Sequence, residues 1–267
     1  MCRTRLAVAI LAACLSVTAA CVLRPAWLSL AIDGGLESAW LETSQFRHRI
    51  LVNEVRGTNL NIFIEGDGGP WIRETRVSVD PTPANPVLLR LMLGVSQPAV
   101  YLGRPCYFGT ASDRACDPTL WTFERYGEAV VSSMCEAANR LARDYSASSL
   151  RLIGYSGGAA IAIGMSICTE RLESIITIAG NLDPDAWAFY HGYSPLTDIT
   201  PLQQAMQSPS AFDETHWQCR DDEKIPPSIT RGYFLQRPNA IQHIVDDCSH
   251  AEGWEQYWSR IFDDGAS

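Results

Sequence analysis

Residues 150–158 read LRLIGYSGG, and this stretch decides the fold. An apolar run typical of a buried strand leads into GYSGG over residues 154–158, which fits the pattern G-x-S-x-G. In so tight a strand-to-helix turn the neighbours must lack bulk, and the serine takes a strained conformation that lifts Oγ above the sheet. The alternative is a plain glycine-rich turn that packs closely or holds a phosphate, although no G-K-[ST] follows and a Walker-type loop is excluded. The stretch therefore predicts Ser156 as an exposed nucleophile.

Strands and helices alternate on both sides of this turn. The predicted strands cover 46–53, 59–65, 99–102, 150–155, 174–179, 214–219 and 240–245, and the predicted helices cover 123–145, 157–168, 227–237 and 251–262. This alternation, with nearly continuous apolar strands, is typical of an α/β fold with a mostly parallel central sheet covered by helices on both faces. Because chemistry gathers at the carboxyl ends of such strands, the partners of Ser156 are expected at that edge.

A serine hydroxyl needs a base that takes its proton. Three of the five histidines fall inside predicted strands, where a histidine is more often structural: His48, His216 and His243. His250 comes directly after the last strand and before the last helix, where it can reach Ser156 across the strand ends. His191, in the segment 181–213, is the weaker alternative.

The base needs a carboxylate that holds its tautomer and stabilises the imidazolium. Asp222 follows the strand predicted at 214–219 and is the first choice. Its neighbour Asp221 and Asp183, which follows the preceding strand, stay open as alternatives. Each of the three could also be an ordinary loop carboxylate or helix cap.

The chain order Ser156, Asp222, His250 is that of the α/β-hydrolase fold, which the sequence resembles over roughly residues 46–262. The stretch DEKIP, which begins at Asp222, is similar to the acid loop D-x-x-[VI]-P of many esterases and lipases with that fold, although Cys219 stands where a glycine is usual. Three stretches also resemble a group of bacterial hydrolase-like lipoproteins: GRPCYFG (103–109), GYSGG (154–158) and AGNLDPDAW (179–187).

This resemblance implies a serine hydrolase that cleaves a carboxylic ester or a related acyl bond in a small-molecule or lipid substrate. The reaction would run through a Ser-His-Asp triad and an acyl-enzyme, with neither a metal nor an organic cofactor. The alternatives are a peptidase or acyltransferase with the same triad, and a non-catalytic envelope protein that keeps the fold. A fold does not fix a substrate, so these hypotheses stay open.

Hydrolases of this fold also need two backbone donors for the oxyanion. One is expected from Gly157, the residue after the nucleophile. The second is expected from Asp67, in the loop EGDGGPW that follows the strand at 59–65, where Glu65 stands in place of the usual histidine. A carboxylate beside a developing oxyanion is costly, so the Asp67 side chain is expected to point away. The alternative is a plain glycine turn.

The segment 181–213 is long and rich in aromatic residues. A loop of this length inside an α/β domain is usually functional. It is expected to form an aromatic cap insertion over the site, although each of its rings could instead simply pack on the sheet.

The N-terminus is typical of an export signal over residues 1–20, with a short basic start, an apolar stretch and small residues. A cysteine after small residues resembles a lipobox, and Cys21 is favoured over Cys14 as the lipidated residue. Residues 21–45 would then form an anchor or linker and residues 46–267 the hydrolase-like domain. These features predict a periplasmic or cell-envelope lipoprotein held on a membrane by an N-terminal lipid.

Charge and cysteine content narrow the partners and the compartment. The chain has 21 basic and 30 acidic residues, and without Arg3 and Arg5 the net charge is near −11, which argues against nucleic acid. Six of the nine cysteines follow the predicted signal and lipidation site, an even number that indicates disulfides. Cys106 is expected to bond Cys116 across a short loop, and Cys219 to bond Cys248 between neighbouring strand ends. For the latter two, buried free thiols are the alternative.

Overall fold

The computed structural model describes residues 24–73 and 75–263. The predicted export signal at 1–20 and the candidate lipidation sites Cys14 and Cys21 lie outside these residues. Among the described residues, no helix is both long and apolar enough to span a bilayer.

The centre of the molecule is a mostly parallel sheet of eight strands in the order β1-β2-β6-β3-β7-β8-β9-β10. β1 and β2 pair antiparallel, β2 is antiparallel to β6, and the strands from β6 to β10 are parallel. The strands are β1 (Glu37–Glu42), β2 (Arg47–Val52), β3 (Asn59–Ile64), β6 (Ala99–Leu102), β7 (Ser149–Tyr155), β8 (Leu172–Ile178), β9 (Asp213–Cys219) and β10 (Ile241–Val245), and a separate hairpin joins β4 (Trp71–Ile72) to β5 (Arg76–Val77).

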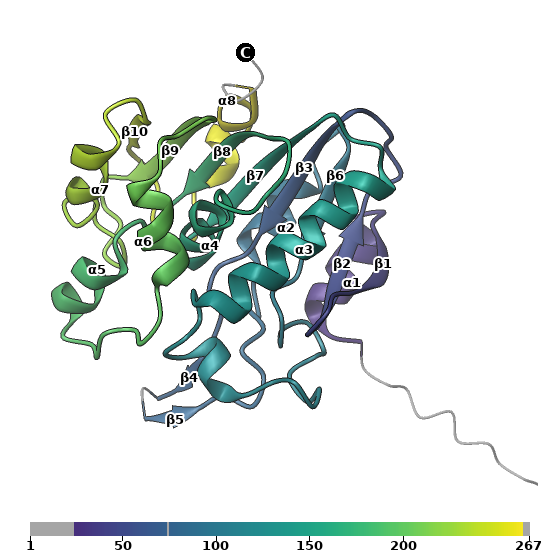
Figure 1. Cartoon of the computed structure of the whole chain (residues 1–267), viewed down its shortest axis with the longest axis horizontal. Coiled ribbons are helices and arrows are strands. Elements are labelled where there is room, and N and C mark those ends of the chain that lie inside the picture. The colour runs from purple at the N-terminus through teal and green to yellow at the C-terminus, as the bar shows by residue number, and fades with distance from the viewer. Residues whose placement is uncertain (1–23, 74, 264–267) are drawn as a thin grey trace, which may run out of the picture.

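Helices cover both faces of this sheet. Figure 1 shows α3, α4 and α6 in front of it, with α2 and α8 behind. The α-helices are α1 (Ala26–Asp33), α2 (Val87–Met92), α3 (Glu128–Asp144), α4 (Gly157–Met165), α5 (Pro184–His191), α6 (Thr200–Gln207), α7 (Arg231–Gln236) and α8 (Trp258–Asp263), and the 3₁₀ helices are η1 (Pro118–Trp121) and η2 (Trp254–Tyr257). The predicted α/β architecture is confirmed.

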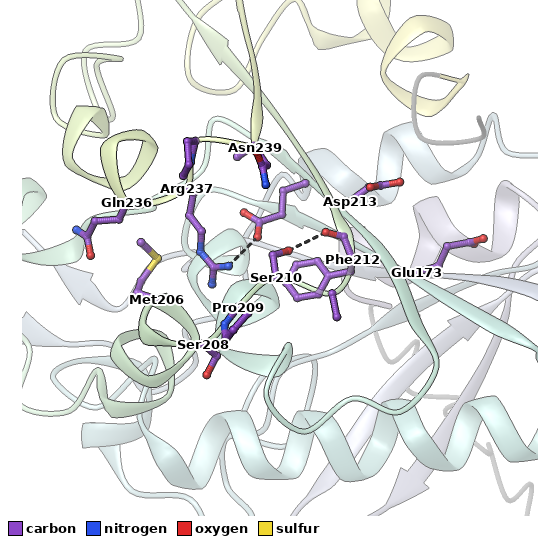
Figure 2. Close-up of a pocket in the computed structure, with 14 residues that line it drawn as sticks. Glu173, Met206, Ser208, Pro209, Ser210, Phe212, Asp213, Gln236, Arg237 and Asn239 are labelled. Carbon is purple, nitrogen blue, oxygen red and sulfur yellow. Dashed lines mark hydrogen bonds and ion pairs between the residues drawn. The ribbon is translucent and has the colours of Figure 1, made fainter.

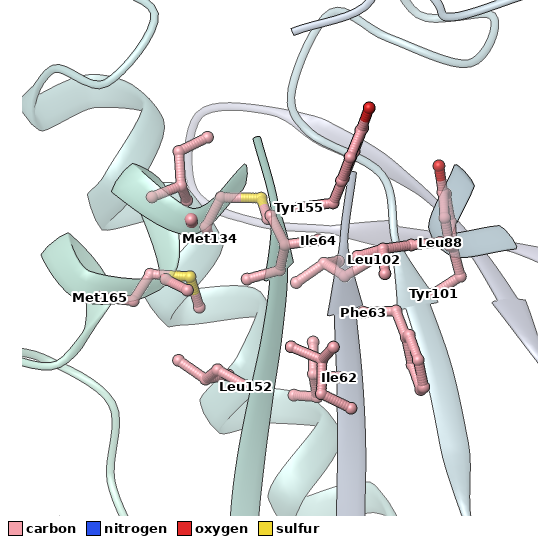
Figure 3. Close-up of a cluster of buried hydrophobic side chains, with 14 of the residues drawn as sticks. Ile62, Phe63, Ile64, Leu88, Tyr101, Leu102, Met134, Leu152, Tyr155 and Met165 are labelled. Atoms are coloured by element: carbon pink, nitrogen blue, oxygen red, sulfur yellow. The ribbon is translucent and has the colours of Figure 1, made fainter. Parts of the chain in front are cut away.

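The core lies on both sides of the central strands. In β3 every residue after the first is buried, as expected for a strand between two helical layers. Figure 3 shows Met134 and Met165 on one side of the central strands and Phe63 and Tyr101 on the other. α4 is buried around its whole circumference, which fixes the start of that helix relative to the sheet.

The folded domain starts before the boundary expected at residue 46. α1 and β1 belong to it, because β1 forms a sheet edge against β2 and Trp27 of α1 packs edge-to-face on Phe108. β1 escapes detection from sequence because it is an antiparallel edge strand in which only Leu41 is buried.

The aromatic segment 181–213 is partly helical. Pro184 and Pro201 lie in the first turns of α5 and α6, where a proline loses no hydrogen bond. α6 packs on α4, with Pro201 against Gly164, so it covers the sheet and not the strand ends. α5 carries several aromatic rings, and the centroid of the His191 ring lies 5.2 Å from that of Tyr193, just after the helix.

Candidate active site

Ser156 occupies a sharp turn between β7 and α4. Its φ of 52° and ψ of −122° lie in a region that ordinary residues avoid. A Cβ on Gly158 would lie 2.1 Å from the Ile64 carbonyl oxygen, and one on Gly154 would lie 2.6 Å from the Gly158 carbonyl oxygen. The two glycines are therefore required by close backbone packing, and the chain holds the serine side chain at the carboxyl edge of the sheet.

His250 lies in the loop after β10 and faces Ser156. Its Nε2 is 2.9 Å from Ser156 Oγ, so the neutral imidazole can accept the serine proton. The loop is held in place because the His250 carbonyl accepts hydrogen bonds from the Tyr155 hydroxyl at 3.0 Å and from Trp254 Nε1 at 3.0 Å. The base is thus positioned by the residue that precedes the serine and by η2.

Asp222 completes the constellation. Its Oδ2 lies 2.8 Å from His250 Nδ1, which donates to it in the tautomer that leaves Nε2 free to accept. Its Oδ1 accepts from the backbone N–H groups of Lys224 at 2.8 Å and Ile225 at 2.9 Å. The Asp222 side chain is fully buried and that of His250 is 12% exposed, so this pair is largely shielded from water.

The structure places the alternative residues elsewhere. Asp183 accepts from the Ala186 N–H at 2.9 Å and caps α5. Asp221 lies exposed beside Asp222. His191 lies on α5, where its Nε2 donates to the Lys224 carbonyl at 2.8 Å and links that helix to the acid loop. The three preferred residues come together and these alternatives do not.

The loop after β3 lies directly against the serine turn. A Cβ on Gly66 would lie 3.1 Å from Ser156 Cβ. The Asp67 carboxylate does not point away as expected, because a Cβ on Gly157 would lie 2.1 Å from Asp67 Oδ1. The carboxylate therefore lies beside the first turn of α4, next to the expected oxyanion donors.

Two guanidinium groups allow a carboxylate at this position. Arg104 Nη1 lies 2.7 Å from Asp67 Oδ1, and Arg125 Nη1 lies 3.2 Å from Asp67 Oδ2. The Tyr126 hydroxyl donates to Oδ2 at 2.6 Å. Burial alone would raise the pKa of Asp67, but Arg125, Arg104 and the Tyr126 hydrogen bond outweigh it and hold that pKa below its usual value. The expectation failed because it treated Asp67 as a lone charge.

We call Asp67, Arg104, Arg125 and Tyr126 the Asp67 cluster. Its two arginines and its tyrosine were not predicted from the sequence. Arg104 lies inside the quoted stretch GRPCYFG, which offered a signal, whereas Arg125 and Tyr126 lie in no recognised motif. The Tyr107 hydroxyl adds a further bond to this loop, since it donates to the Asp67 carbonyl at 3.1 Å.

Glu65 lies buried at the start of the same loop. Its carboxylate accepts from the N–H groups of Gly66 at 3.2 Å and Leu88 at 2.9 Å, and from the Tyr101 hydroxyl at 3.2 Å. Burial raises the pKa of Glu65 to about 7 despite these bonds. This residue connects β3, β6 and α2 beneath the loop that carries Asp67.

Three disulfides are present among the described residues. Cys106–Cys116 and Cys219–Cys248 form as expected, with Cα atoms 5.6 Å and 5.8 Å apart. A third bond, Cys135–Cys168, joins two cysteines that the sequence left unassigned. Cys219–Cys248 ties the end of β9 to the loop that carries His250. Disulfides persist in oxidising compartments, so these bonds indicate an extracellular or periplasmic location.

A large cavity lies at the other edge of the sheet. It has a volume of about 670 Å³, and its lining includes residues 208–214, which lead into β9, and 236–240, which lead into β10. Figure 2 shows Arg237 reaching into this region from the chain segment before β10. Ser156 follows β7, and the strands are parallel, so the cavity and the serine lie at opposite edges. The cavity is therefore not a substrate pocket for Ser156.

Comparison with known proteins matches the architecture to solved structures. No family model and no curated protein sequence matches the chain. It is similar to an α/β serine hydrolase without a lid from Xanthomonas campestris, with 15% identity, 86% of this chain and 90% of that one covered, and a TM-score of 0.52. It is also similar to an esterase from Pyrococcus furiosus, with 13% identity, 87% of this chain and 91% of that one covered, and a TM-score of 0.60.

A membrane phospholipase A described as a bacterial virulence factor is similar to the same degree. It is 15% identical, with 90% of each chain covered and a TM-score of 0.57. Identities this low speak to the fold alone. Together with the sheet order and the helices on both faces, these likenesses show that the chain has the α/β-hydrolase fold.

Proposed function

We propose that the protein is a serine hydrolase that cleaves a carboxylic ester or a related acyl bond. Ser156 is the nucleophile, His250 the general base and then acid, and Asp222 the residue that orients the imidazole. The observation that carries the proposal is the continuous hydrogen-bond chain at the carboxyl edge, with Oγ to Nε2 at 2.9 Å and Nδ1 to Oδ2 at 2.8 Å. The strained backbone of Ser156 adds support, because such strain is typical of functional residues.

The reaction proceeds in two halves. Ser156 Oγ attacks the carbonyl carbon as His250 Nε2 takes its proton, and the negative oxygen of the tetrahedral intermediate accepts from the backbone N–H groups of Gly157 and Asp67. His250 then gives the proton to the leaving alcohol, and an acyl-enzyme remains. A water molecule, deprotonated by His250, attacks the acyl-enzyme and releases the acid while Ser156 regains its proton.

The substrate class follows from the supporting likenesses and the compartment. An esterase and a phospholipase A have this fold, which supports a small-molecule or lipid ester. The three disulfides fit action outside the cytoplasm. In this proposal the chain is exported and held on a membrane by a lipid on Cys21.

The proposal is tested by turnover on a panel of p-nitrophenyl esters of increasing acyl length, with an aminopeptidase substrate measured beside them. Ester turnover that Ser156→Ala abolishes supports the proposal. Turnover of the peptide substrate alone favours a peptidase. Loss of neither activity in Ser156→Ala would exclude this serine as the nucleophile.

A further inference from the structure

Arg125 has hydrogen-bonding capacity that the protein does not use. A guanidinium carries five N–H donors in a fixed planar fork. Among the described residues, the only acceptor for the Arg125 side chain is Asp67 Oδ2 at 3.2 Å, and Nε has no partner. The side chain is only 9% exposed. A buried donor of a charged group without a partner, here Nε, is costly and points to an external acceptor.

The net charge of the Asp67 cluster also favours an anionic ligand, because the cluster has an excess of positive charge. It contains two guanidinium groups and one carboxylate, while burial raises the pKa of Tyr126 well above its usual value and keeps that hydroxyl neutral. Arg104 is committed to the protein, because Nη1 donates to Asp67 Oδ1 and Nη2 to the Arg125 carbonyl at 2.9 Å. Arg104 Nε also has no partner, but the Arg104 side chain is only 1% exposed, whereas that of Arg125 is 9% exposed. The unpaired donors that a ligand can reach are therefore on Arg125.

Arg125 is also close to the reacting serine. It contacts Asp67, whose carboxylate lies against Gly157, the residue after Ser156. On another side the guanidinium carbon lies 5.4 Å from the ring centroid of Trp187 in α5. An aromatic face beside a guanidinium restrains its plane. The group is thus held between the serine turn and α5, the helix that His191 links to the acid loop.

We propose that Arg125 is a specificity-determining residue that pairs with an anionic group, a carboxylate or a phosphate, carried by the substrate near its scissile acyl bond. This inference rests on the proposed hydrolase function and narrows its substrate to anionic esters. Arginine suits the role because its planar fork matches both anions in a bidentate geometry. Asp67 does not repel such a ligand outright, because both its oxygens are already engaged by cationic or hydroxyl donors.

The kinetic test uses pairs of esters that differ in one charge. p-Nitrophenyl hydrogen glutarate is compared with its neutral methyl ester for an anion on the acyl side, and 4-acetoxybenzoate with its neutral methyl ester for an anion on the alcohol side. In at least one pair, kcat/KM should favour the anionic member. Arg125→Gln should reduce that preference about tenfold to a hundredfold, the scale of a charged hydrogen-bonded contact. Arg125→Lys should retain part of it, because the charge stays and the fork is lost.

The variants are designed to keep the fold. In Arg125→Gln the Asp67 carboxylate still accepts from Arg104 and Tyr126. Arg140→Gln is the matched control, because it removes a half-exposed guanidinium on α3 that pairs with Asp144 on the same helix and donates to the Glu42 carbonyl, away from Asp67. A thermal unfolding scan checks each variant, and Arg125→Lys replaces Arg125→Gln in the test if the latter is unfolded. No preference in either ester pair, or a preference that both Arg125 variants keep, would overturn the inference.

A binding measurement separates this inference from the proposed function. The full chain is titrated calorimetrically with glutarate and with inorganic phosphate, which distinguishes a carboxylate from a phosphate ligand. Wild type and Ser156→Ala should bind at least one of the two, and Arg125→Gln should bind it at least about tenfold more weakly. This result would support the anion site even if no ester were hydrolysed. Binding of neither anion, or equal binding to Arg125→Gln, would contradict the site even if neutral esters were turned over.

Discussion

Two clusters of buried charged side chains lie at opposite edges of the same sheet, and they differ in net charge. At the carboxyl edge, the Asp67 cluster has two arginines for one carboxylate and adjoins the serine turn. At the amino edge, Glu214 is within 3.4 Å of Arg237 and accepts from the Tyr233 hydroxyl at 2.6 Å. A cavity of about 670 Å³ lies at the amino edge, yet the aligned proton acceptor and donor groups lie at the carboxyl edge.

The amino-edge group illustrates a purely structural use of charge. His216 lies 3.4 Å from Glu214, but burial lowers its pKa and disfavours the charged imidazolium. Burial would raise the pKa of Glu214, but the hydrogen bonds from His216 and Tyr233 and the charge of Arg237 hold it below its usual value. One cation then balances one anion. We call the carboxyl edge the reactive edge, following the proposed function. What separates it from the amino edge is preorganised geometry and surplus charge, not the presence of a cavity.

The largest expected effect is at the reactive edge. Asp222→Asn should lower kcat by up to about 10⁴, because the neutral side chain no longer holds the tautomer of His250 or stabilises its imidazolium. Asp221→Asn is the matched control and should leave kcat near the wild-type value, because its side chain is an exposed neighbour. Steady-state kinetics on the best ester checks both. Equal losses in the two variants would count against Asp222 as the orienting acid.

The disulfides offer a second comparison of regions. Cys219–Cys248 and Cys135–Cys168 close loops of 29 and 33 residues, so removing either by double Ser substitution should cost a similar stability, about 3–4 kcal/mol in the chain-entropy model. Only the loss of Cys219–Cys248 should also lower kcat, by up to about 100-fold and with less effect on KM. Without this bond, the loops that carry Asp222 and His250 are no longer tied together.

Urea unfolding and kinetics on both double variants make this measurement. Equal kcat values in the two would show that the Cys219–Cys248 bond does not position the triad. Detection of free Cys219 and Cys248 by mass spectrometry, in wild-type protein recovered from an oxidising compartment, would remove the premise altogether.

Glu214→Gln should change stability without changing chemistry. It leaves the buried Arg237 without its counter-charge, which should cost about 3 kcal/mol in the free energy of unfolding. Because Glu214 lies at the edge opposite Ser156, kcat/KM should stay close to that of wild type. Chemical denaturation and ester kinetics check the two parts. A large loss of kcat/KM in a folded variant would break the proposed separation of the two edges.

The smallest expected effect is a pH dependence from Glu65. Its pKa is raised by burial from 4.5 to about 7 in the folded state, so the folded protein binds the extra proton between these values. The contribution of Glu65 to the free energy of unfolding is therefore full below about pH 4.5. It falls by up to about 3 kcal/mol as the pH rises through about 7. His48, whose pKa burial lowers to about 4, acts with the opposite sign between about pH 4 and 6.5.

Urea unfolding of wild type and Glu65→Gln at pH 5 and pH 8 isolates the contribution of Glu65 to the free energy of unfolding, because His48 is present in both proteins. The wild type should lose more stability than the variant between the two pH values. Identical losses would show that Glu65 keeps an ordinary pKa in the folded protein.

Most of the reactive edge could be predicted from sequence. Ser156 follows the apolar strand β7, whereas Asp222 and His250 follow the more polar strands DETHWQC and IQHIV. The order of the elements identifies all three positions, because parallel strands bring their carboxyl ends together. Arg125 and Tyr126 could not be predicted, because their role depends on how the segment before α3 folds back onto Asp67. No local spacing encodes that contact. The edge strand β1 was missed for a related reason, since one buried side chain gives no periodic signal.

The central claim is that Ser156 is an activated nucleophile. It is tested most directly by incubating the folded protein with a fluorophosphonate and measuring its intact mass. The account predicts the addition of one phosphonyl group on Ser156, found by peptide mapping, and no addition to Ser156→Ala. Absence of labelling in a well-folded wild-type protein with its disulfides intact, or labelling that persists in Ser156→Ala, would contradict the account.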